Sequence, residues 1–90
     1  QEDPEDPFSR YALALELATE ESGRAIGLLL SLLKENPSYV PSYYQASLLL
    51  LEQNQLEETK IILEKGIKIA RQQNDLKAAT ELKQLLDELD

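Results

Sequence analysis

Apolar residues recur along this chain in five segments, each with the spacing of a helix. The last segment shows this best, because Leu82, Leu85, Leu86 and Leu89 fall on one stripe of a helix with a polar opposite face. Similar patterns place helices over residues 7–18, 24–35, 41–53, 56–73 and 76–89. The sequence therefore predicts an all-α fold of about five helices in one domain.

Helix-breaking and capping residues separate these segments. Asp6 precedes Pro7 and is suited to be the N-cap of the first helix, and Asp75 has the same place before the last helix. Pro37 ends the second helix, and Asn54 is suited to a left-handed residue after the third. Residues 19–23 are expected to form a turn. Residues 1–6 are acidic and proline-containing, which predicts an extended arm.

Gly66 lies inside the fourth predicted helix, where glycine costs about 1 kcal/mol relative to alanine. Its presence predicts that another helix passes close to it.

Charge and composition exclude several classes of function. The net charge is −8, with 17 acids against 9 bases, which disfavours binding to nucleic acids and to anionic membranes. No apolar run approaches the roughly 20 residues that span a bilayer, so no membrane insertion is expected. The chain has no Cys and no His, and no nucleophile–base pair can be assembled from its residues. We therefore expect no catalytic site, no cofactor and no metal site.

The chain repeats itself weakly at an offset of about 34 residues. This offset aligns apolar and small positions of neighbouring segments: Ala25 with Thr59, Leu28 with Ile62, Leu33 with Ile67, Tyr44 with Ala78, and Leu48 with Leu82. A period of about 34 residues is that of the tetratricopeptide repeat.

The sequence between residues 41 and 73 resembles one whole tetratricopeptide repeat. Tyr43 stands at the aromatic position, Ala46 and Ser47 at the small pair, and Thr59 and Gly66 at the two alanines of the second helix. The resemblance implies a short right-handed α-solenoid. It consists of a degenerate repeat (7–40), a full repeat (41–73) and a capping helix (75–90).

The resemblance also implies where a partner would bind, because the first helix of each hairpin lines the concave face in this family. The residues expected there are Tyr11, Leu15 and Ala18, then Tyr44, Gln45, Leu48 and Leu51, and finally Leu82 and Leu85. They lack the Lys and Asn side chains with which family members clamp a terminal carboxylate. Such a groove suits an apolar or helical segment.

Three alternatives stay open at this point. The same apolar stripe is equally suited to be core, or to be buried in a symmetric homodimer without a foreign ligand. The third alternative is a fragment of a longer repeat protein, which the absence of an initial Met suggests. The absence of cysteine fits a cytoplasmic protein. The resemblance implies that it acts as an adaptor for a protein or peptide partner.

Overall fold

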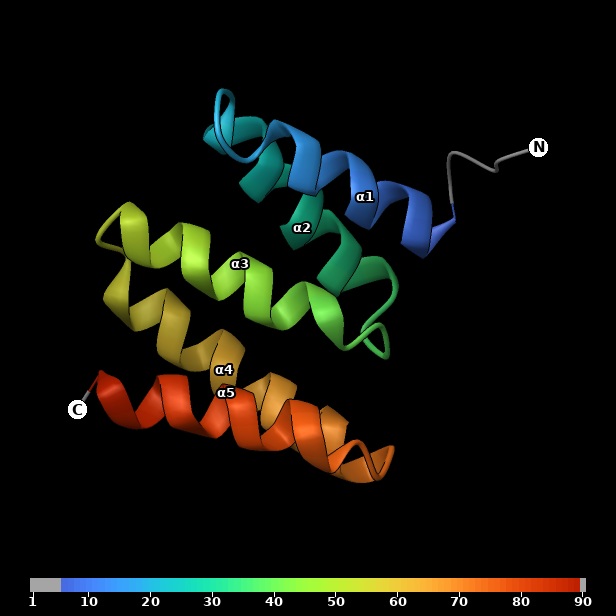
Figure 1. The fold of residues 1–90 in the computed structure, drawn as a ribbon, viewed down its shortest axis with the longest axis vertical. Coiled ribbons are helices and arrows are strands. Elements are labelled where there is room, and N and C mark those ends of the chain that lie inside the picture. The colour runs from blue at the N-terminus through green and yellow to red at the C-terminus, as the bar shows by residue number, and fades with distance from the viewer. Residues whose placement is uncertain (1–5, 90) are drawn as a thin grey trace.

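The computed structural model describes residues 6–89 as five α-helices joined by short turns (Figure 1). The helices are α1 (Pro7–Leu17), α2 (Ser22–Glu35), α3 (Pro41–Glu52), α4 (Leu56–Gln72) and α5 (Leu76–Glu88). The predicted all-α class is confirmed. The predicted arm, apart from Asp6, and the last residue of the predicted capping helix lie outside the described residues.

Each helix packs against the next one along the chain, and the stack measures 39 × 30 × 18 Å. Helices α1, α3 and α5 lie side by side, with α2 and α4 behind them (Figure 1). This arrangement gives the molecule one side built from the odd-numbered helices, and the candidate site lies on that side.

The helix starts follow from local capping. The carboxylate of Asp6 accepts a hydrogen bond from the Ser9 amide at 3.1 Å, and that of Asp75 accepts one from the Ala78 amide at 3.1 Å. Both predicted N-caps are confirmed. The second helix begins at Ser22, two residues before the predicted start, because the Glu21 carbonyl already accepts a hydrogen bond from the Ala25 amide at 3.0 Å.

Two of the helices end in the same way, with an asparagine in the left-handed conformation. Asn54 has φ 60° and Asn74 has φ 58°. After α3, the Gln55 amide reaches back to the Leu50 carbonyl and the Asn54 amide to the Leu51 carbonyl, which is a Schellman ending. The predicted role of Asn54 is confirmed. This ending stops α3 at Glu52, one residue before the predicted end.

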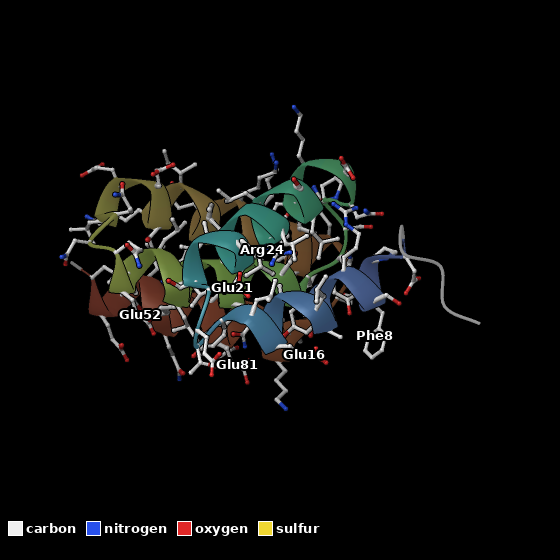
Figure 2. The ribbon with its side chains drawn as sticks, turned by 90° about the horizontal axis from the view of Figure 1, so that it is seen from above. Phe8, Glu16, Glu21, Arg24, Glu52 and Glu81 are labelled. Carbon is white, nitrogen blue, oxygen red and sulfur yellow. The ribbon has the colours of Figure 1, made fainter. Side chains whose placement is uncertain are left out.

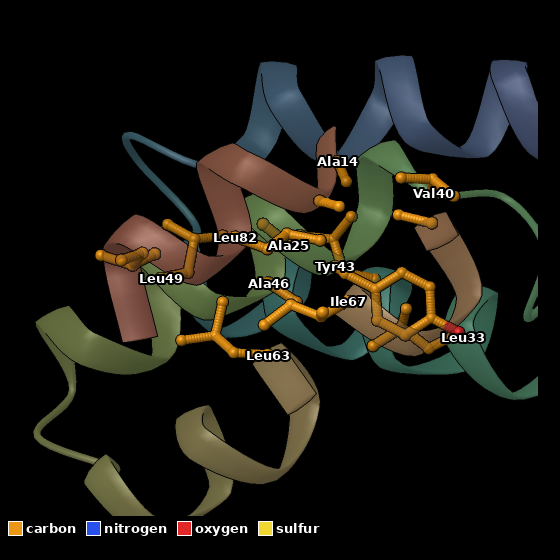
Figure 3. Packing of buried hydrophobic residues seen from close by; sticks show 14 residues of the cluster. Ala14, Ala25, Leu33, Val40, Tyr43, Ala46, Leu49, Leu63, Ile67 and Leu82 are labelled. Carbon is orange, nitrogen blue, oxygen red and sulfur yellow. The ribbon is translucent and has the colours of Figure 1, made fainter. Parts of the chain in front are cut away.

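The core is centred on Tyr43, the largest of the fully buried side chains (Figure 3). A Cβ atom added to Gly66 would lie 2.8 Å from the Cβ of Tyr43 and 3.2 Å from a methyl carbon of Leu82. The backbone of α4 therefore approaches α3 and α5 more closely than any residue with a side chain would allow. The close approach predicted from Gly66 is confirmed.

The Tyr43 hydroxyl donates a hydrogen bond to the Pro37 carbonyl at 2.6 Å. This bond ties the core to the segment between α2 and α3. Burial raises the pKa of the Tyr43 hydroxyl above its ordinary value of 10.0.

We expect Gly66→Ala to destabilise the protein by about 1–3 kcal/mol, because the added methyl group overpacks against Tyr43 and Leu82. The matched control is Gly27→Ala in α2, where an added Cβ meets nothing within 4 Å. That variant should gain about 0.5–1 kcal/mol from helix propensity. Urea unfolding followed by far-UV circular dichroism measures both. A stabilising Gly66→Ala variant would contradict the close approach.

We expect stability to fall as the pH rises above about 10. Burial favours the neutral Tyr43 hydroxyl, so the pKa of this group is higher in the folded state than in the unfolded state. Its contribution to the free energy of unfolding is fully present below the unfolded pKa and is lost as the pH rises through the folded pKa. The Tyr43→Phe variant removes the hydrogen bond, at a cost of about 0.5–1.5 kcal/mol near neutral pH. Its stability should then fall less steeply with alkaline pH. If the free energy of unfolding fell equally steeply with pH in the wild type and in Tyr43→Phe, ionisation of Tyr43 would not contribute to the alkaline loss of stability.

Candidate partner-binding groove

A hollow of about 340 Å³ lies between α1, α3 and α5. Its walls come from all three helices and from the turns that precede α3 and α5. The lining residues are Tyr11, Val40, Pro41, Tyr44, Gln45, Asp75, Ala78, Glu81 and Leu82. The spacing of the odd-numbered helices therefore leaves room for side chains of another molecule.

One wall of this hollow is a small polar and aromatic cluster around Tyr11. The Tyr11 ring packs edge-on against Tyr39, with the ring centres 5.6 Å apart and the planes at 62°. Burial raises the pKa of the Tyr11 hydroxyl, and a side-chain hydrogen bond with Gln45 acts in the opposite direction. Side chains of α1 and α3 thus meet at this wall, where Tyr11 and Gln45 both line the hollow. The wall is thus held by contacts within the chain.

A second hollow, of about 240 Å³, continues from the first one along α3 and α5. Its lining residues are Tyr44, Glu81, Gln84, Leu85 and Glu88, so Tyr44 and Glu81 belong to both hollows. We call the two together the concave groove. Tyr44 is half-buried and Glu81 is exposed, which places an aromatic ring and a carboxylate at the middle of the groove.

The charged residues that line the concave groove are all acidic: Asp75, Glu81 and Glu88. Each comes from α5 or from the turn before it. Figure 2 shows Glu81 on the same side of the molecule as Glu16 of α1. A ligand in the groove would therefore meet negative charge.

The structure brings together five of the residues that the sequence assigned to the groove. Tyr11, Tyr44, Gln45 and Leu82 line the first hollow, and Leu85 lines the second. Leu48 and Leu51 of α3 are half-buried against the core, as is Ala18, while Leu15 of α1 is 41% exposed.

Leu82 and Leu85 line the hollows and also belong to the core. Leu82 is only 1% exposed and Leu85 9%. Leu82 contacts α4 at the position of Gly66. Most of the Leu82 side chain is therefore buried by the packing of α5 onto α4. For these two residues the structure favours the alternative that the stripe is core. Only their edges reach the hollows.

Sequence reasoning missed Glu81 and Phe8 as residues of this side. Glu81 stands where the repeat pattern has a small residue, and this departure is a signal by which the sequence could have revealed it. Phe8 is 64% exposed and points to the same side as Glu81 (Figure 2). It lies seven residues before the exposed Leu15, which is a helical spacing that places both on one stripe of α1.

Two further searches of residues 6–89 bear on function. No group of three or more acidic, histidine or cysteine side chains is arranged to hold a metal ion. No helix in this part of the chain has the length and apolarity needed to cross a bilayer.

Comparison with known proteins finds similarity among solved structures. No protein-family model matches the chain, and a search of curated proteins finds no significant match. The solution structure of a tetratricopeptide repeat domain protein from Salinibacter ruber superposes with a TM-score of 0.94 at 33% identity. The match covers 99% of this chain and 91% of that one.

A crystal structure of a tetratricopeptide repeat domain protein from Salinibacter ruber gives a TM-score of 0.90 at 31% identity, over 94% of this chain and 96% of that chain. Similarity in sequence and in fold thus extends over nearly the whole chain. The small residue at the α3–α4 contact and the 34-residue spacing agree with it. The chain belongs to the tetratricopeptide repeat family.

Proposed function

We propose that the protein is an interaction module that binds an apolar or helical segment of a protein partner in the concave groove. The observation that carries this proposal is the 340 Å³ hollow, into which α1, α3 and α5 all contribute side chains. Its volume is within the range of roughly 300–1,000 Å³ that is usual for ligand sites. The proposal is one of binding and not of catalysis.

The lining of the hollow supports binding of a peptide. Tyr11 and Tyr44 are half-buried, so each ring is held by the protein and still has surface to offer. Tyrosine is enriched among residues that dominate binding energy, because a rigid aromatic side chain loses little entropy on contact. Both rings stand on helices, which position them more rigidly than loops would.

A second copy of this chain is the alternative occupant of the groove. The exposed apolar side chains Phe8 and Leu15 on α1 favour it, since a homodimer would cover them.

A cytoplasmic location and an adaptor role stay predictions from the sequence.

We expect Tyr44→Ala in the groove, and Leu48→Glu one helical turn further along the same stripe of α3, each to weaken binding of a groove peptide about tenfold or more, which is about 1.4 kcal/mol. The ligands are peptides selected from a random phage-displayed library on the wild-type protein, and fluorescence anisotropy measures their affinity. The control is Ile61→Glu on α4, which makes a charge change like that of Leu48→Glu at a side chain 64% exposed and outside the groove. Circular dichroism verifies that all variants are folded. Equal affinities of folded Tyr44→Ala, Leu48→Glu and Ile61→Glu would remove the groove from the proposal.

We expect the chain to remain a monomer of about 10 kDa in light scattering behind size exclusion, over a hundredfold range of concentration. The chain mass is 10.2 kDa. A dimer that Tyr44→Ala converts to monomer would show that a second copy occupies the groove. A dimer that persists in this variant would place the self-association elsewhere.

A further inference from the structure

The lining of the concave groove also restricts the chemistry of its ligand. We propose that the bound segment carries a lysine or arginine side chain, seated against Glu81 between α3 and α5, next to an apolar side chain in the tyrosine-walled hollow. This inference rests on the proposed function and names the class of partner for the same site.

The first argument is the placement of the acids on α5. Glu81 and Glu88 are seven residues apart, which is about two helical turns, so their side chains stand on one stripe about 10 Å apart along the axis. Both line the second hollow, and Glu81 also lines the first. The stripe thus follows the groove and not the outer face of α5.

The second argument is that the chain does not neutralise these acids itself. The ion pairs that Arg10, Arg24 and Lys83 make use Glu35, Glu21 and Asp87, respectively. Within residues 6–89, neither Glu81 nor Glu88 forms an ion pair. Glu81 and Glu88 are therefore available to a cation from a partner.

The third argument is the chemistry around Glu81. Tyr44 lines both hollows together with Glu81, so a cation beside this carboxylate would also be near the ring, whose face attracts positive charge. The long aliphatic part of a lysine or arginine side chain would pack on apolar surface such as Ala78. An acidic segment would instead meet like charge, which costs binding energy and slows association.

The test is the same random phage-displayed library, selected on the wild-type protein at about 50 mM salt. We expect the selected peptides to be enriched in Lys or Arg beside a large apolar residue. Their affinity should fall about tenfold or more for Glu81→Lys and less for Glu81→Gln. It should also fall as the salt rises to about 500 mM, because an exposed charge pair is screened.

The matched control is Glu20→Lys, which makes the same change in net charge at an exposed residue outside the groove. It should leave the affinity within about twofold of wild type, since a screened charge at a distance contributes little. If Glu20→Lys and Glu81→Lys lowered the affinity for the peptides equally, the loss would be due to the net charge of the protein, and the inference would be overturned.

The outcomes separate this inference from the proposed function. Neutral or acidic peptides that lose affinity with Tyr44→Ala would overturn the basic ligand and leave the groove as the binding site. Selected peptides that bind every groove variant equally well, or the absence of any selected peptide, would overturn both.

Discussion

The close approach of Tyr43 to Gly66 is the contact on which the rest of this structure depends. With a 2.8 Å separation between the Tyr43 Cβ and the place of a Gly66 Cβ, only glycine is accommodated at that point of α4. Leu82 packs at the same point, so α3, α4 and α5 meet there. The family has a small residue at this position for the same reason. Hydrophobic burial provides the free energy, and the missing side chain sets the distance between helices.

Polar groups at the helix contacts have a secondary role. Ser42 and Thr59 are fully buried, and each hydroxyl donates to a backbone carbonyl, that of Tyr39 and that of Gln55, at 2.7 Å. The hydroxyl of Ser47 is buried among residues 6–89 without a hydrogen-bond partner there. An unpaired buried hydroxyl costs free energy, so the polarity of Ser47 does not explain why a serine occupies this position. The small volume of its side chain explains it, because the residue is fully buried where α3 packs against its neighbours.

The groove is a consequence of how α5 is packed. Burial of Leu82 and Leu85 fixes the rotation of α5 about its own axis. That rotation turns Glu81 and Glu88 toward the hollows beside α3. The same packing that closes the core therefore gives the groove its negative charge. On the other wall, Tyr11 of α1 lies near Gln45 of α3, and both side chains line the hollow. The core and the proposed binding surface thus adjoin each other on the same helices.

The sequence by itself determined the number and class of the elements, the caps at Asp6 and Asp75, and the close approach at Gly66. These depend on neighbours within a few residues or on steric limits that one residue type reveals. Its resemblance to the tetratricopeptide repeat also placed Tyr11, Tyr44 and Gln45 on one side. Only the tertiary structure decided that Leu82 and Leu85 are core and that Glu81 lines the groove. Periodicity tells which residues share a stripe of a helix, whereas the contacts with other helices decide which stripe is covered.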